Sequence, residues 1–127
     1  MRSRVVTILC CAAVLSLSTA SADARTAQTL TAPASSGQTI HMHVGDKLKV
    51  HLGTSFRRPT STDRSVIHRI NHSGGYPTSE DARATFKALA VGKATIHSVT
   101  DAPCLHSTPR CEIAQQEWFV HVVVKTG

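Results

Sequence analysis

Residues 39–52 read TIHMHVGDKLKVHL, and this stretch decides the fold class because apolar and polar residues alternate along it. Histidines and lysines fill most of the positions between the apolar residues Ile40, Met42, Val44, Leu48, Val50 and Leu52. A period of two residues is typical of strands that have one face in a core and the other in solvent. The stretch therefore predicts two strands joined by a turn at Val-Gly-Asp.

Short alternating or β-branched patterns follow in RSVIHRIN (64–71), ARATFKALAVG (82–92), VGKATIHSVTD (91–101) and EWFVHVVVKTG (117–127). A helix is the alternative for residues 82–92, because alanine and leucine favour helices. Six or seven short strands at near-regular spacing predict an all-β fold, an antiparallel β-sandwich. Aromatic residues make up 4% of the chain, so Phe86 and Trp118 are expected to be the largest side chains of an otherwise aliphatic core.

The N-terminus has the pattern of a cleaved secretory signal. Arg2 and Arg4 precede an apolar run at 5–17, and small residues allow cleavage after Ala22 or Ala24. The run is shorter than the roughly 20 residues that span a membrane, so we expect no membrane span after cleavage. The protein is therefore expected to be secreted, in the medium or associated with the cell wall.

Three segments make up the expected chain organisation. A signal peptide occupies 1–24, and a flexible lead-in of mostly Ser, Thr, Ala and Pro occupies 25–37. A single β-sandwich domain follows at 38–127, a length that suits one small hydrophobic core.

The two cysteines outside the signal, Cys104 and Cys111, lie in DAPCLHSTPRCEIAQQEW (101–118). A zinc site would need four ligands, and only His106 lies nearby. A redox pair would favour the spacing C-x-x-C. In a secreted chain the C-x6-C spacing instead indicates a structural disulfide, which stabilises a closed loop of this size by roughly 2 to 3 kcal/mol.

The chain has eight histidines, which raises the question of a metal site. His41 and His43 share one face of a predicted strand, about 7 Å apart. His121 would join them if the first and last strands pair, and three imidazoles could then bind zinc or copper. The simpler interpretation is that these histidines fill exposed strand positions, and we expect no cofactor.

The chain is basic, with a formal net charge of +6, which favours an anionic partner. Arg57, Arg58 and Arg64 gather around one predicted loop, and arginine suits bidentate contact with carboxylate or phosphate. An extracellular protein or an anionic wall polymer is the expected partner, and a merely solvated loop is the alternative. Nucleic acid is not expected, because aromatic platforms for stacking bases are missing.

No set of catalytic residues is recognisable. The chain lacks G-x-S-x-G and a phosphate-binding glycine loop, and its two remaining cysteines are expected to be paired. We therefore expect a non-catalytic protein with a binding or structural role.

Residues 38–125 resemble bacterial immunoglobulin-like domains. The similar segments are IHMHVGDKLKVHL, STDRSVIHRI, ATFKALAVGKATIHSVTD and WFVHVVV. The resemblance implies an Ig-like β-sandwich of about seven strands that works at the cell surface or outside the cell.

The opening segment also resembles the chagasin-like inhibitors of cysteine peptidases, whose three loops contact the enzyme. Here those loops would lie near 53–63, 73–80 and 102–114. The family's first loop reads N-P-T-T-G-Y and a later one R-P-W, whereas the first-loop position here reads GTSFRRPTSTD. SGGYP at 73–77 resembles a glycine-rich loop, so the resemblance implies peptidase inhibition as an alternative function.

Overall fold

The computed structural model describes residues 28–31 and 34–126, and the predicted signal peptide at 1–24 lies outside the described residues. The strands are β1 (Gln28–Thr31), β2 (Thr39–His43), β3 (Lys47–His51), β4 (Thr60–Ser61), β5 (Ile67–Ser73), β6 (Arg83–Ala88), β7 (Gly92–Val99) and β8 (Glu117–Lys125). A 3-10 turn, η1 (Pro103–His106), interrupts the connection between β7 and β8. Among these residues no helix is long and apolar enough to cross a membrane.

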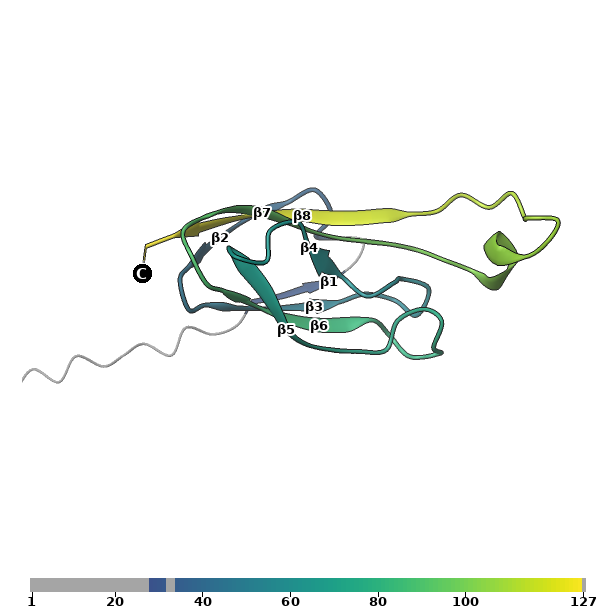
Figure 1. The fold of residues 1–127 in the computed structure, drawn as a ribbon, viewed down its shortest axis with the longest axis horizontal. Coiled ribbons are helices and arrows are strands. Elements are labelled where there is room, and N and C mark those ends of the chain that lie inside the picture. The colour runs from purple at the N-terminus through teal and green to yellow at the C-terminus, as the bar shows by residue number, and fades with distance from the viewer. Residues whose placement is uncertain (1–27, 32–33, 127) are drawn as a thin grey trace, which may run out of the picture.

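The strands form two four-stranded sheets that face each other, in the orders β1-β3-β6-β5 and β2-β8-β7-β4 (Figure 1). This arrangement confirms the all-β sandwich. Both sheets are mixed, because β1 pairs with β3 and β2 pairs with β8 in parallel, while the other pairs are antiparallel. The chain changes sheet between β1, β2 and β3, so the first two strands each lie at a sheet edge beside a strand of the same direction.

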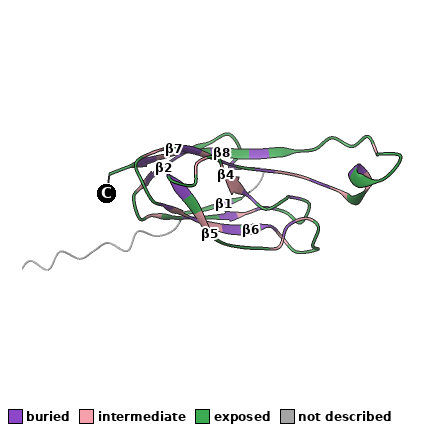
Figure 2. Cartoon of the chain, in the orientation of Figure 1, coloured by how far each residue is buried: buried purple, intermediate pink, exposed green. Residues whose placement is uncertain are grey.

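The core lies between the two sheets, where buried positions alternate along the strands (Figure 2). Phe86 and Trp118 are among the largest fully buried side chains, as the sequence predicts. The Trp118 indole donates a hydrogen bond to the Ser35 hydroxyl at 3.3 Å, which in turn donates to the Thr31 carbonyl. The N-terminal segment is thereby connected to the last strand.

Two strands were not expected from the sequence. β1 lies inside the segment 25–37, for which the sequence predicts no regular structure, and β4 has only two residues. Residues 83–88 form a strand rather than the alternative helix. β5 also differs in detail, because a bulge between Arg69 and Asn71 interrupts the alternation and leaves Ile70 exposed.

Candidate functional site

Three long loops extend from one end of the sandwich, which we call the loop end. They are the β3–β4 loop (52–59), the β5–β6 loop (74–82) and the β7–β8 loop (100–116). The β7–β8 loop projects furthest from the sheets (Figure 1). These are the three segments that the chagasin-like resemblance implies.

Backbone hydrogen bonds join the β3–β4 loop to both of the other loops. The Tyr76 amide donates to the Phe56 carbonyl at 2.8 Å, which connects it to the β5–β6 loop. The Asp101 amide donates to the Ser55 carbonyl, also at 2.8 Å, which connects it to the β7–β8 loop. An isolated bridge between Phe56 and Thr100 adds to the second connection. The loops therefore form one hydrogen-bonded unit.

The buried carboxylate of Asp101 is the centre of this unit. Arg57 donates to it from Nε at 2.6 Å and forms an ion pair with it through a second guanidinium nitrogen. The Ala102 amide and the His106 ring each donate to its other oxygen at 2.8 Å. Burial acts to raise the pKa of Asp101, but these hydrogen bonds and the charge of Arg57 outweigh it and lower the pKa.

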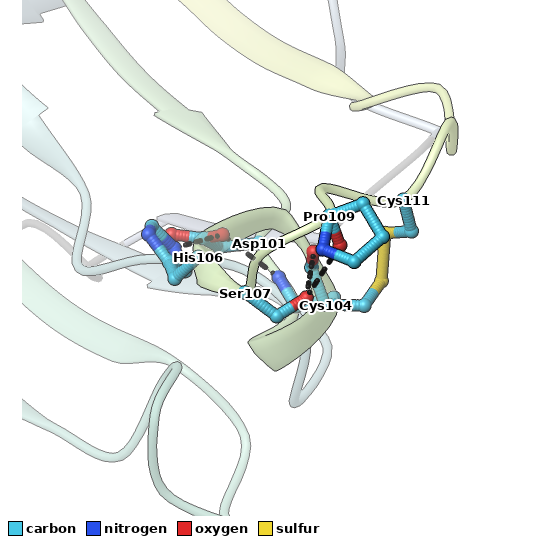
Figure 3. Close-up of a disulfide and its surroundings, with 7 residues drawn as sticks. Asp101, Cys104, His106, Ser107, Pro109 and Cys111 are labelled. Atoms are coloured by element: carbon cyan, nitrogen blue, oxygen red, sulfur yellow. Dashed lines mark hydrogen bonds and ion pairs between the residues drawn. A yellow bond between two sulfur atoms is a disulfide. The ribbon is translucent and has the colours of Figure 1, made fainter.

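His106 also connects the β7–β8 loop to the β5–β6 loop. Its ring stacks on Tyr76 with centroids 6.1 Å apart and planes inclined by 21°. The hydrogen bond between its Nε2 and Asp101, drawn in Figure 3, holds the same ring. His106 is thus a link between two loops.

The predicted disulfide between Cys104 and Cys111 is present, with Cα atoms 5.3 Å apart (Figure 3). The Cys111 amide donates to the Cys104 carbonyl at 3.0 Å, and the Ser107 hydroxyl bonds the same carbonyl at 2.9 Å. Leu105, within the same turn, is buried. The tip of the longest loop is therefore closed covalently and by hydrogen bonds.

The three predicted anion-binding arginines do not share one site. Arg57 is bonded to Asp101, and it lines a recess of about 560 Å³ together with Arg58, Tyr76 and His97. Arg64 lines a separate recess of about 90 Å³. Of the two arginines at the first recess, Arg57 is engaged by Asp101, and no ion pair among the described residues involves Arg58.

The predicted metal-binding histidines lie on paired strands, because β2 does pair with β8. The register places His121 opposite Thr39, and it places His41 opposite Val123. His121 contacts the Thr95 hydroxyl at 3.2 Å, and His43 lies beside Asp46. In the part of the chain that the structure describes, no group of three His, Cys, Asp or Glu side chains could hold a metal ion.

Sequence reasoning named Arg57 as an anion-binding residue but missed Asp101 as its partner and missed the contact between Tyr76 and His106. Asp101 stands at a turn, where a carboxylate commonly bonds its own backbone, and its bond to Ala102 fits that role. Its partner Arg57 lies 44 residues away, and Tyr76 and His106 are 30 residues apart in the sequence. Only the fold brings these side chains together.

No family model and no curated protein matches the sequence of this chain. Among solved structures it is similar to the cysteine protease inhibitor EhICP2 from Entamoeba histolytica, with a TM-score of 0.56 and 16% identity over 77% of this chain and 94% of the inhibitor. It is also similar to PbICP-C, solved in complex with falcipain-2, with a TM-score of 0.51 and 15% identity over 77% and 99% of the two chains. At these identities the likeness shows a shared fold. It agrees with the chagasin-like resemblance and gives no support to the bacterial immunoglobulin-like one.

Proposed function

We propose that this protein inhibits papain-like cysteine peptidases by placing its loop end against the active-site cleft. The observation that carries the proposal is the joining of three loops into one unit through Asp101. The fold that presents these loops is shared with the cysteine protease inhibitor EhICP2 and with PbICP-C, which was solved in complex with falcipain-2. The proposal gives the expected non-catalytic binding protein one class of partner, the papain-like cysteine peptidases.

Preorganised loops suit this role because a binder loses less conformational entropy when its contact segments are already ordered. Pre-organised protease inhibitors typically change little on binding. Here the disulfide, the Tyr76–His106 stack and the Asp101 bonds order the loops before any partner is present. The family's loop motifs are absent, so the contacts with the enzyme would come from the tips that this chain has.

Those tips carry exposed side chains. Thr54 is exposed in the β3–β4 loop, and Ser79 is exposed in the β5–β6 loop. Within the described part of the chain, neither side chain forms a hydrogen bond that holds the loops together, because the joining bonds come from neighbouring residues. A bulky charge at these two positions would obstruct a partner without removing an internal bond.

The proposal includes a location outside the cell, which the predicted signal peptide and the disulfide support. Disulfides persist in oxidising compartments, and the Cys104–Cys111 bridge closes the loop that projects furthest. The partner would then be a peptidase encountered in such a compartment.

The test is a titration of the purified, oxidised protein against a papain-like peptidase, with residual activity on a fluorogenic peptide as the readout. Stoichiometric inhibition is expected from the wild type. The double variant Thr54→Arg/Ser79→Arg should have an inhibition constant at least about 30-fold higher than the wild type, which is the size of a hot-spot effect. The matched control Leu89→Arg/Val91→Arg adds the same charge at exposed positions of the β6–β7 turn and should inhibit like the wild type.

Two results would count against the proposal. Absence of inhibition by the folded wild type at micromolar concentration would remove the partner class. Equal inhibition by both double variants would show that the enzyme does not contact the loop end.

A further inference from the structure

The outer face of the β1-β3-β6-β5 sheet is a second surface of unusual composition. Strand pairing arranges its outward side chains in three rows that cross the sheet. The first row is Lys47, Lys87 and His68; the second is Thr29, Lys49, Thr85 and Asn71; the third is Thr31, His51, Arg83 and Ser73. Successive rows are roughly 7 Å apart and neighbouring strands about 4.8 Å apart.

The charged side chains in these three rows are all cations. Lys47 lies directly opposite Lys87, a pairing of like charges that is unfavourable for the sheet itself. Among the described residues, no ion pair involves Lys47, Lys49, Arg83 or Lys87. The nearby carboxylate of Asp81 bonds the His51 ring at 2.8 Å. The positive charge of the face is therefore not compensated by opposite charges within the sheet.

A recess of about 280 Å³ lies on the same face. Its walls carry two cations, one imidazole, and hydroxyl and amide groups, contributed by Lys49, Arg83, His51, Thr29, Thr85, Ser73 and Asn71. Val50 and Ala84 also line the recess, and both are buried residues of the sheet. The recess thus offers charged and neutral donors together, with no large exposed apolar side chain.

The bulge in β5 contributes to this recess. It lies between Arg69 and Asn71, and after it the register sets Asn71 opposite Thr85 and Ser73 opposite Arg83. Asn71 and Ser73 thereby share the outward face with their partners on β6. β-Bulges are common beside active sites, where they change the direction of a side chain.

We propose that this sheet face binds a sulfated polysaccharide. Cations one strand spacing apart match a ligand with more than one anionic group per sugar unit, and the hydroxyl and amide groups of the recess match the hydroxyls of the sugar. Arg83 supplies the fork geometry that suits a sulfate. The lysines tested below, Lys49 and Lys87, lie on the strands and not on the loops, whereas Arg83 and Ser73 also line a recess with Thr54 and Ser79 of the loop end.

Other polyanions fit this face less well. A lipid surface would call for apolar side chains beside the cations, and the residues of the recess include no exposed large hydrophobic one. Single-stranded nucleic acid would call for aromatic stacking platforms, and no aromatic residue other than histidine lies in the three rows. Lipid vesicles and single-stranded DNA are therefore included as comparison ligands in the test.

The test measures binding of the oxidised protein to heparin oligosaccharides by calorimetry at physiological salt. The probes for comparison are hyaluronate, which carries carboxylates only, neutral dextran, single-stranded DNA, and vesicles that contain anionic phospholipid. We expect heparin to bind and to weaken as salt rises, with hyaluronate at least tenfold weaker and dextran not bound.

The variant Lys49→Gln/Lys87→Gln should bind heparin about tenfold less tightly, because it removes two exposed ionic contacts. Its control is Lys93→Gln/Lys125→Gln, with the same charge change on strands β7 and β8 of the other sheet. Peptidase inhibition should be the same for both variants. Equal losses of heparin binding in the two variants would overturn the site, and tighter binding of vesicles, DNA or hyaluronate than of heparin would overturn the ligand.

Discussion

The two ends of the sandwich are built differently, although the same strands lead into both. At the loop end, segments of eight to seventeen residues are joined by hydrogen bonds, a buried carboxylate and a disulfide. At the opposite end the connections are short turns at 44–46, 62–66 and 89–91. Backbone hydrogen bonds join these turns too, as from the Leu89 amide to the Val66 carbonyl, but among the described residues no disulfide and no buried carboxylate holds them. Long loops carry a larger entropy cost, so their ordering points to a role beyond joining strands.

A glycine at each end of the sandwich allows the rigidity of the two ends to be compared by substitution. Gly74 begins the β5–β6 loop with a φ of +62°, and a Cβ there would overlap the backbone carbonyl of Asp81. Gly45 lies in the β2–β3 turn with a φ of +94° and nothing within 4 Å of its Cβ position. Gly45→Ala is expected to cost about 1 kcal/mol from backbone strain alone, whereas Gly74→Ala adds a steric overlap and is expected to cost about 3 kcal/mol or more.

Urea unfolding of the wild type and the two variants measures the loss of unfolding free energy caused by each substitution. Gly74→Ala should also weaken any peptidase inhibition, while Gly45→Ala should leave it unchanged. Similar free energies for the two variants would mean that the β5–β6 loop yields readily, and the ends would then differ less than their contacts indicate.

The second prediction concerns the disulfide at the tip of the β7–β8 loop. Replacement of Cys104 and Cys111 by serine should lower the free energy of unfolding by about 2.5 kcal/mol in the chain-entropy model. The measurement is urea unfolding of the oxidised wild type and the double variant. Addition of a reductant should lower the stability of the wild type to that of the variant and leave the variant unchanged. A response of the variant to reductant would show that the effect does not come from this bridge.

Much of the sandwich could be predicted from the sequence because alternation reports directly on burial. The stretch 39–52 became β2 and β3, and Leu48 and Val50 are buried where the pattern places them. The pattern fails where a strand is too short to alternate, as in β4, or where a bulge shifts it, as at Ile70. The pairing of strands is not encoded in alternation, and the parallel edge strands went unforeseen.

The candidate site was predictable only where the interacting residues lie close together in the sequence. The C-x6-C spacing indicates a disulfide because both partners lie close in the sequence. Asp101 and Arg57 carry no such local signal, because their bond depends on how the loops meet in space. The three cationic rows likewise arise only when β3, β6 and β5 are set in register.

The smallest changes in unfolding free energy are expected from substitution of two aspartates, one at each end of the sandwich. Asp101 bonds across loops, whereas Asp63 bonds Ser65 within its own turn at the opposite end. The pKa of each is lowered: for Asp63 chiefly by the Ser65 hydroxyl, and for Asp101 because its hydrogen bonds outweigh the effect of burial. A lowered pKa contributes stability that is present above the ordinary value of 3.8 and is lost as pH falls through the lower value of the folded state.

Asp101→Asn and Asp63→Asn should therefore each differ from the wild type most at neutral pH and converge with it in acid. The effect is modest because Arg57 is half exposed and solvent screens its charge. Unfolding free energies between pH 2 and 6 test the convergence, and the chemical shifts of the Tyr76 and His106 rings locate it. Those rings should move in Asp101→Asn and stay in place in Asp63→Asn, because only Asp101 bonds the ring that stacks on Tyr76. Unmoved rings in both variants would mean that the carboxylate is not what holds the three loops together.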